Sequence, residues 1–442
     1  MSQTYRRHRE QLMNRLSDGL IVLSGGQEIT RNNDVTYVFR QKSNFLYLTG
    51  VEEPNCHLLI DPKDRLVTLF IPRTDARYKV WLGYVPSPKE ASELFGIDRV
   101  LYSDRFKDEV KKAAKKHKKI YTDPDAAKFL NGTLKEPGGT DDLEDALWEL
   151  RAVKTPGELE LLREASRISG RAHRAVMKAA RPGMKEYEAQ AIFEAECLRA
   201  GLKHLAYPSI VAAGKNAAVL HYHRNNAEIK KGDFLLIDAG GELNGYGADI
   251  TRTFPVGARF NTRQKDVYTV VLEAQKQCIG QALPEKTSLD LHLCAMRVLA
   301  DGLKSMKILK GKTDDLMENG AVRLFFPHGI GHLLGLDVHD GMGGKRRAMP
   351  NPSKIKMRFI AKLEPGFVIT VEPGLYFIDV LLNDRKNREK YKSFVDFDRA
   401  ESFIDIGGVR IEDDIVIGEQ GSPLNLTDVP KEIDDIEAAC DL

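Results

Sequence analysis

Apolar residues in the first third of the chain form short continuous runs that alternate with segments of helical periodicity. The runs at 20–23, 57–60 and 67–71 are typical of buried strands, whereas the segments 107–116 and 141–151 are typical of helices. Strands that alternate with helices predict an α/β domain. Trp81 could line a cleft or pack this domain, and we expect it in the domain core.

A helix start signal follows this region. Thr155 is a candidate N-cap, Pro156 takes the first helical position, and Glu158 completes a capping box three residues after the cap. Helical periodicity continues to about residue 180, and a second helix is predicted over 186–200. We therefore predict an N-terminal α/β domain at 1–154 and a second domain at 155–442.

The second domain changes character beyond about residue 207. β-rich segments punctuated by Gly and Pro follow one another there, with one further helical stretch at 264–282. We predict an α+β domain of antiparallel strands backed by helices.

Charge and hydropathy exclude several classes of protein. The 442 residues carry 66 Lys and Arg against 64 Asp and Glu, and their net charge is +2. No overall field would hold a polyanion, so nucleic acid is not expected as a partner. No stretch reaches the roughly 18 apolar residues of a membrane span, and the start lacks the apolar core of a signal peptide. We expect a soluble protein with no membrane partner.

The cysteines point to a reducing compartment. They are odd in number and widely scattered, and none forms a Cys-x-x-Cys pair. The five are Cys56, Cys197, Cys278, Cys294 and Cys440. We expect reduced, buried or incidental thiols in a cytoplasmic protein.

Two aspartates flank a predicted β-hairpin. Asp238 ends the apolar strand 234–238, Asp249 begins the next, and Asn244-Gly245 between them is a preferred two-residue turn. If the turn is tight, Asp238 faces Thr251, and Asp249 lies diagonally across the same face. The two carboxylates could then share cations. Alternatively, each aspartate simply ends a strand or caps a turn.

Three histidines lie within twelve residues of one another. His328, His332 and His339 stand in a glycine-containing segment that predicts a loop rather than the helix of a His-Glu-x-x-His zinc site. A single histidine here would be typical of a satisfied core residue, but three together favour a site. Their spacing does not say which of them binds a metal. His221 adds another imidazole in a segment predicted to be extended.

Two further segments carry carboxylates. Glu372 ends an apolar, β-branched run at a Pro-Gly turn, where a carboxylate needs a partner. In the segment 409–415, a period of two puts Arg410, Glu412 and Asp414 on one face. A surface strand with its charges outward explains this second segment nearly as well.

Together these residues resemble a known metal set. Asp238, Asp249, His332, Glu372 and Glu412, in this order and setting, are similar to the five ligands of the pita-bread peptidases, the family of methionine aminopeptidase, aminopeptidase P and prolidase. The resemblance covers about residues 155–442 and implies the pita-bread fold. In addition, residues 5–49 resemble the N-terminal domain shared by aminopeptidase P and prolidase, which methionine aminopeptidases lack.

Within the family, the chain resembles prolidases most. Glu372 and Glu412 are separated by an insertion at 377–406 that aminopeptidases P have in shorter form. The segment 357–366 resembles the prolidase segment whose arginine pairs with the free carboxylate of the substrate. This implies that a buried Arg358 restricts the enzyme to Xaa-Pro dipeptides.

The resemblance also implies two divalent cations. Four carboxylates and one imidazole suit manganese, our first expectation, or else cobalt or zinc. Asp238 would bind one ion, His332 and Glu372 the other, and Asp249 and Glu412 would bridge them. A hydroxide held between the ions would attack the peptide carbonyl.

Further roles follow from the same motif positions. Glu372 would act as general base and then as general acid, and His221 and His339 would hold the carbonyl or its oxyanion. His328 would line the proline pocket. Arg410 would balance the negative charge of the metal ligands, unless it is a plain strand-surface arginine.

The expected partners are a small peptide substrate and a second copy of the chain in a homodimer. One alternative is an Xaa-Pro aminopeptidase that accepts longer peptides. Another is a non-catalytic pita-bread protein that binds partners, or a metal-free relative such as creatinase. Both of these have lost metal ligands, whereas all five positions are filled here.

Overall fold

The computed structural model describes residues 2–134, 138–341, 343–351, 355–419 and 421–441. The chain divides into two compact units, one of residues 1–151 with 344–346 and the other of residues 152–343 with 347–442.

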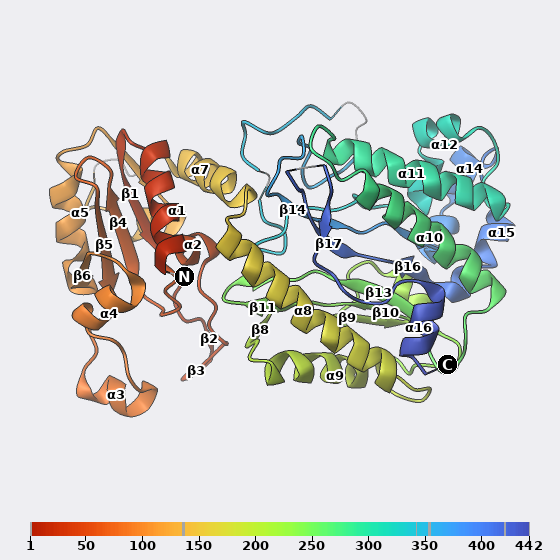
Figure 1. The fold of residues 1–442 in the computed structure, drawn as a ribbon, viewed down its shortest axis with the longest axis horizontal. Coiled ribbons are helices and arrows are strands. Elements are labelled where there is room, and N and C mark those ends of the chain that lie inside the picture. The colour runs from red at the N-terminus through yellow and green to blue at the C-terminus, as the bar shows by residue number, and fades with distance from the viewer. Residues whose placement is uncertain (1, 135–137, 342, 352–354, 420, 442) are drawn as a thin grey trace. The chain divides into compact units, whose positions relative to one another are not determined.

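The first unit is built on a mixed five-stranded sheet in the order β6-β5-β4-β1-β7 (Figure 1). The neighbours β1–β4 and β4–β5 are antiparallel, whereas β5–β6 and β1–β7 are parallel. The three predicted strands form its middle because their apolar runs are buried. The strands are β1 (Gly19–Ser24), β4 (His57–Asp61), β5 (Leu66–Ile71), β6 (Arg99–Tyr102) and β7 (Lys119–Thr122).

Helices accompany this sheet, and a small hairpin of β2 (Thr30–Asn32) and β3 (Val35–Thr36) extends from the unit. The predicted α/β class is confirmed. The helices are α1 (Ser2–Arg15), α2 (Ser43–Thr49), α3 (Ala76–Leu82), α4 (Pro88–Phe95), α5 (Phe106–Ala114), α6 (Pro124–Phe129) and α7 (Thr140–Ala152). The expectation for Trp81 was wrong, because this side chain on α3 is 76% exposed.

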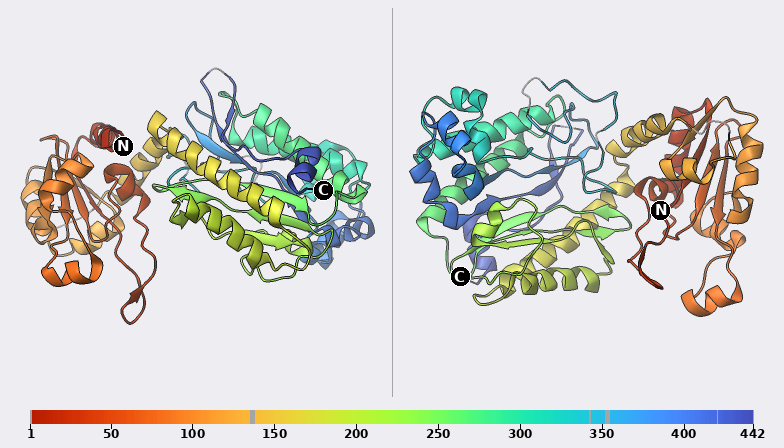
Figure 2. Two further views of the ribbon diagram at one scale, coloured as in Figure 1. Left: turned by 60° about the horizontal axis from the view of Figure 1, so that its bottom comes forward. Right: turned by 180° about the vertical axis from the view of Figure 1, so that it is seen from behind.

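The second unit opens with α8 (Pro156–Ala179) and α9 (Glu186–Arg199), which lie side by side (Figures 1 and 2). The predicted capping box starts α8: the backbone N–H of Glu158 donates to Thr155 Oγ1, and the Glu158 carboxylate accepts from the Thr155 N–H. These interactions satisfy N–H groups that the first helical turn leaves unpaired.

A second helix pair, α10 (Thr262–Gly280) and α11 (Ser288–Ser305), packs together, and α10 contacts strands of the same unit. The expectation of only one helix beyond residue 207 was wrong. The signal for α11 was present: Thr287 caps it by accepting from Asp290 N–H, and its buried residues recur at helical spacing. Shorter helices follow: α12 (Thr313–Asn319), α13 (Asp379–Leu382), α14 (Arg385–Tyr391), α15 (Phe397–Glu401) and α16 (Ile433–Ala439).

Every pairing between the named strands of the second unit is antiparallel, as predicted. The sheets are β13-β10-β9, β12-β11-β8, β14-β17-β18 and β15-β16. The strands are β8 (His204–Leu205), β9 (Ile210–Ala213), β10 (Phe234–Asp238), β11 (Gly241–Leu243), β12 (Tyr246–Gly247), β13 (Thr251–Pro255), β14 (Val368–Val371), β15 (Gly374–Tyr376), β16 (Gly408–Arg410), β17 (Asp413–Val416) and β18 (Leu424–Asn425).

The hydrophobic core of this unit is continuous from α8 and α9 through the strands to α10 and α11. The strand ends that carry the candidate site are thus held by packed elements on several sides. In the part of the chain that the structure describes, none of the helices has the length and apolar character that crossing a membrane requires.

Candidate metal centre

One pocket of the second unit, with a cavity of about 340 Å³, is lined by all ten residues to which a metal-binding, catalytic or substrate-binding role was assigned from the sequence. Its volume is that of a small-molecule site. The ten residues are His221, Asp238, Asp249, His328, His332, His339, Arg358, Glu372, Arg410 and Glu412.

The hairpin places the two aspartates. β10 and β13 pair in the predicted register, with Asp238 opposite Thr251, and Leu243 faces Tyr246 at the turn. Asp249 precedes β13, and its backbone N–H donates to Asp414 Oδ2 at 3.2 Å. Asp238 and Asp249 are only 8% and 5% exposed, so both carboxylates lie largely out of water.

The histidine loop lies against β14. The Thr370 N–H donates to the His332 carbonyl at 2.9 Å, and the Glu372 N–H donates to the Ile330 carbonyl at 2.9 Å. Gly331 is required at this approach, because a Cβ there would stand 2.0 Å from the Thr370 carbonyl oxygen. The loop therefore brings His332 Nε2 to 3.7 Å from Glu372 Oε1.

Glu412 lies in the short break between β16 and β17. Its backbone N–H donates to the Thr251 carbonyl at 3.1 Å, and the Thr251 hydroxyl donates to Glu412 Oε2 at 2.6 Å. Residues 408–417 are all buried, so the surface-strand alternative was wrong. Arg410 and Glu412 line the same pocket, as predicted, whereas the Asp414 carboxylate accepts a hydrogen bond from the Asp249 backbone N–H.

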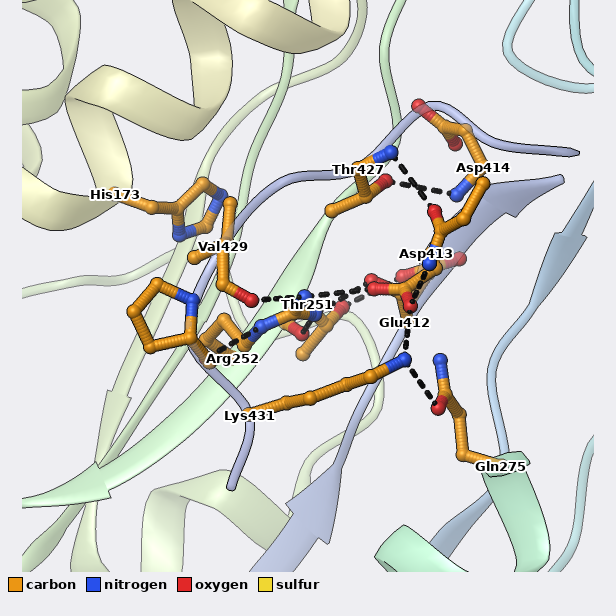
Figure 3. Close-up of polar contacts among 12 residues, drawn as sticks. His173, Thr251, Arg252, Gln275, Glu412, Asp413, Asp414, Thr427, Val429 and Lys431 are labelled. Carbon is orange, nitrogen blue, oxygen red and sulfur yellow. Dashed lines mark hydrogen bonds and ion pairs between the residues drawn. The ribbon is translucent and has the colours of Figure 1, made fainter. Parts of the chain in front are cut away.

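A buried ion pair lies behind Glu412 (Figure 3). Arg252 is 0% exposed; its Nη1 donates to the Glu412 carbonyl at 2.8 Å, and its Nη2 donates to Asp413 Oδ1 at 2.7 Å. Lys431 Nζ donates to the other oxygen of Asp413 at 2.6 Å. These contacts fix the backbone that carries Glu412.

The chemistry of the site fits divalent cations. Ligand atoms of Asp249, His332 and Glu412 lie within 4.8 Å of one another. Burial, then the nearby charges of Asp249 and Glu372, raises the pKa of Glu412 well above its usual range. Burial also raises the pKa of Glu372 to about 7, with Asp249 adding to the shift. Carboxylates crowded in this way favour a cation between them or retain protons.

The tautomer of His332 suits a ligand. Its Nδ1 lies 3.1 Å from the Leu333 carbonyl oxygen, which can only accept, so Nδ1 carries the proton. This leaves Nε2 as the atom that can face a metal, and it lies 3.4 Å from Asp249 Oδ2. A backbone hydrogen bond of this kind is typical of metal-binding histidines.

Two tyrosines that were not expected from the sequence contact the site. Tyr207 donates to Asp238 Oδ1 at 2.6 Å, and Arg410 Nη2 donates to Asp238 Oδ2 at 2.5 Å. Arg410 Nη1 also donates to the Tyr376 hydroxyl at 2.9 Å. Tyr376 in turn lies 2.8 Å from His328 Nε2. Tyr376 stands only four positions after Glu372, whereas nothing near Tyr207 in the sequence marks it.

His328 is neutral at ordinary pH. Burial, followed by the charge of Arg410, lowers its pKa to about 3. Its Nδ1 lies 2.8 Å from the Gly329 carbonyl oxygen and therefore donates, so Nε2 accepts from Tyr376. Both ring nitrogens thus have protein partners, as expected for a residue that lines the pocket.

His221, His339 and Arg358 form the open part of the wall, and all three side chains are exposed. The expectation of a buried Arg358 was wrong. It makes no hydrogen bond or ion pair with any residue that the structure describes, so its guanidinium is free to receive an anion. His339 is nevertheless partly enclosed by the pocket, and this partial desolvation, then the charges of His332, Arg358 and His221, lowers its pKa to about 3.

The segment that carries His339 is anchored by a buried ion pair. Lys154 Nζ lies 2.9 Å from Asp340 Oδ2, and both side chains are 1% exposed. The Asp340 N–H also donates to the Leu333 carbonyl at 2.9 Å. His339 therefore projects into the pocket from a segment fixed at the adjacent residue.

Relatives that match the chain over most of its length include proteins named Xaa-Pro dipeptidase and proteins named Xaa-Pro aminopeptidase. It is 37% identical to human Xaa-Pro dipeptidase over 95% of this chain and 88% of that protein. It is 36% identical to a probable Xaa-Pro aminopeptidase of Tuber melanosporum over 95% of this chain and 91% of that protein.

Solved structures share the complete fold. Zinc-substituted Escherichia coli aminopeptidase P, in complex with product, superposes with a TM-score of 0.88 at 33% identity, covering 100% of this chain and 98% of that one. The Pseudomonas aeruginosa aminopeptidase PepP gives a TM-score of 0.87 at 33% identity with the same coverage. The predicted pita-bread fold is confirmed.

Two family descriptions account for most of the sequence. "Aminopeptidase P, N-terminal domain" matches residues 5–121, and "Metallopeptidase family M24" matches residues 160–419. The predicted resemblance is confirmed. With its carboxylate and histidine cluster in the matched region, the chain belongs to metallopeptidase family M24.

Proposed function

We propose that this protein is an Xaa-Pro dipeptidase. The observation that carries the proposal is that Arg358, which has no ion-pair partner among the described residues, lines the same pocket as the five candidate metal ligands. A peptide whose carbonyl meets the ligand cluster can present its C-terminal carboxylate to Arg358 only if the chain ends close by. The human relative named Xaa-Pro dipeptidase supports this substrate class.

Asp238, Asp249, His332, Glu372 and Glu412 would hold two divalent ions. The buried oxygen-rich set suits manganese, which we propose as the native metal, with cobalt or zinc as substitutes. When bound, the two ions lower the pKa of a shared water and stabilise the charge that develops on the carbonyl.

Glu372 is the proposed proton carrier. Its pKa of about 7 in the metal-free protein matches a group that exchanges protons near neutral pH. It would accept a proton at its carboxylate oxygen and return it to the proline nitrogen that leaves. The charge of Arg410, held between Asp238 and Tyr376, would balance the negative charge of the ligands.

The open wall would position the substrate. His221 and His339 can donate from their imidazole nitrogens to the peptide carbonyl as charge develops on its oxygen. His328, fixed by Tyr376 and Gly329, would form part of the proline pocket. Arg358 would pair with the terminal carboxylate.

An Xaa-Pro aminopeptidase is the second candidate. The specific observation in its favour is the TM-score of 0.88 with aminopeptidase P. Because Arg358 is exposed rather than buried, it could also pair with a carboxylate of a longer peptide.

The deciding experiment compares Gly-Pro, Ala-Pro and Ala-Pro-Ala. The purified protein is chelated, and each peptide is then assayed with added manganese, cobalt or zinc. We expect metal-dependent proline release from the dipeptides and little cleavage of the tripeptide. Comparable cleavage of Ala-Pro-Ala would favour the aminopeptidase. No cleavage of any peptide with two metals demonstrably bound would contradict both.

Arg358→Ala tests the specificity. Loss of a charge-assisted pair should lower kcat/KM for Ala-Pro by about 10- to 100-fold, equivalent to roughly 1.5–3 kcal/mol. Activity on Ala-Pro-amide, which lacks the carboxylate, should stay unchanged. Arg297→Ala on α11, an exposed arginine paired with Asp314, is the matched control. An equal loss for both peptides would contradict a carboxylate-reading role.

We also propose a cytoplasmic homodimer. Five free cysteines without a disulfide are typical of a reducing compartment. Val80, Trp81 and Tyr84 are 82%, 76% and 69% exposed around α3, which is the kind of apolar surface that a second copy would cover. Light scattering of the wild type and of Trp81→Ser should give a dimer mass and a weakened dimer, respectively. A monomer at all concentrations would contradict this.

A further inference from the structure

Cys278 and Cys294 do not line the pocket of the candidate metal centre, and they lie close to each other where α10 packs against α11. The Cys278 thiol on α10 lies 3.3 Å from the carbonyl oxygen of Leu291, one turn before Cys294 on α11. The Cys294 sulfur accepts from Gln281 Nε2 at 3.1 Å, one turn after Cys278. Each sulfur thus contacts the turn next to the other cysteine.

The two thiols differ in solvent exposure and in pKa, the two properties that decide which thiol of a pair reacts first. Cys278 is 0% exposed, whereas Cys294 is half-buried and reachable from solvent. The neighbouring Cys278 thiol, then the Gln281 amide and the charge of Lys286, lower the pKa of Cys294 to about 7. Cys294 is therefore the member of the pair that ionises more readily.

The other three cysteines lack these features. Burial raises the pKa of Cys56, Cys197 and Cys440 to about 12 in each case. These thiols stay protonated at neutral pH, which makes them poor nucleophiles. They serve as internal controls within the same chain.

We propose that Cys294 and Cys278 form a hydroperoxide-reactive dithiol that closes to an intramolecular disulfide. The Cys294 thiolate attacks the outer oxygen of the hydroperoxide, so that its O–O bond breaks, an alcohol or water leaves, and Cys294 becomes a sulfenic acid. The Cys278 sulfur then displaces hydroxide from Cys294, and with the thiol proton this departs as water. In total, two thiols are oxidised by two electrons and one peroxide is reduced.

The test counts thiols in the complete protein loaded with zinc, which has no redox chemistry of its own. The protein is exposed to a small excess of hydrogen peroxide, quenched with catalase, denatured and alkylated. Five cysteines should label before treatment, and the loss of one pair should leave three. Peptide mapping should find Cys278 joined to Cys294, and a reductant should restore all five. Five labelled thiols after treatment, or a disulfide between other cysteines, would overturn the proposal.

Single variants separate the two roles. In Cys278→Ser, Cys294 should stop at a sulfenic acid that a cyclic dione traps, whereas Cys294→Ser should keep all four remaining thiols. Cys440→Ser is the matched control and should fall from four labelled thiols to two. Trapping on any other cysteine in Cys278→Ser would contradict Cys294 as the nucleophile. The wild-type mapping does not depend on any variant folding.

Discussion

At the scale of single residues, neutral donors orient the candidate ligands. The Tyr207 hydroxyl donates to Asp238, and the Thr251 hydroxyl donates to Glu412. Burial and the charges of Asp238 and Asp249 raise the pKa of Tyr207 far above its usual range, so its proton stays in place. Such outer contacts fix the direction of the carboxylate lone pairs.

Tyr207→Phe should weaken metal binding while the fold is kept. Loss of an outer hydrogen bond lowers metal affinity by about 10- to 100-fold in comparable sites. Metal titration calorimetry measures this. Tyr246→Phe removes another buried hydroxyl, one that donates to Glu158 at 3.0 Å, and should leave metal affinity unchanged. Equal losses in both variants would mean a general loss of packing.

Buried His173 should make the free energy of unfolding decrease at acid pH. Burial lowers its pKa to about 4, and its Nε2 lies 3.0 Å from the Ala239 carbonyl oxygen. Between the unfolded pKa of about 6.5 and the folded value, only the unfolded chain takes up this proton. The contribution is therefore present above pH 6.5 and is lost as pH falls, by about 2 kcal/mol at pH 5.

The measurement is urea unfolding at pH 7 and pH 5 for the wild type and His173→Gln. The free energy of unfolding should fall less in the variant than in the wild type over this range. Equal slopes would show that His173 does not carry the dependence. His57→Gln is a useful second variant, since burial also lowers the pKa of His57 to about 4.

At the scale of elements, one ion pair ties β13 to β17 (Figure 3). Arg252 also donates to backbone carbonyls of Thr251, Glu412, Val429 and Pro430. Arg252→Met should lower the free energy of unfolding by about 3–5 kcal/mol, because it leaves the Asp413 carboxylate buried with less compensation. Chemical denaturation measures the loss.

A double variant that removes the charges of both Arg252 and Asp413 separates the effect of this ion pair on stability from its effect on metal affinity. Arg252→Met with Asp413→Leu should recover part of the stability, since no buried carboxylate is left without Arg252, and Lys431, which loses its partner, is partly exposed to water. Metal affinity should stay low in the double variant, because the Glu412 carbonyl still lacks its donor. Recovery of both stability and metal affinity would contradict a positioning role for Arg252.

At the scale of the whole molecule, bound metal should stabilise the second unit. Chelation should lower the Tm, because metal at 100 times its Kd contributes about 2.7 kcal/mol. The metal-free protein holds a proton on Glu372 up to about pH 7, whereas the unfolded chain releases it near the ordinary glutamate pKa of about 4.3. The chelated protein should therefore lose stability as pH rises between these values, at most about 1.4 kcal/mol per pH unit.

Calorimetric scans at pH 5, 6 and 7 with and without metal test this. The gap in Tm between loaded and chelated protein should widen as pH rises. Glu372→Gln, which cannot titrate, should reduce the pH dependence of the chelated form. A gap that does not change with pH would contradict the raised pKa of Glu372.

Local signals determined much of the fold. The Asn244-Gly245 turn and the alternation around it set the register that places Asp238 opposite Thr251. The Thr155 capping box likewise defined the start of α8. These features depend on neighbours a few residues away, and turn chemistry and capping are local. The Thr287 cap and the helical spacing of the buried residues in α11 are equally local signals.

The sequence by itself determined which ligand types are present and the family to which they belong. Only the tertiary structure decided which long-range partners meet: Tyr207 donates to Asp238, Arg252 donates to the Glu412 carbonyl, and Cys278 lies against the helical turn before Cys294. It also decided that Arg358 is exposed and that the strand around Glu412 is buried. Burial and long-range contacts arise when distant segments pack together, and no local pattern specifies them.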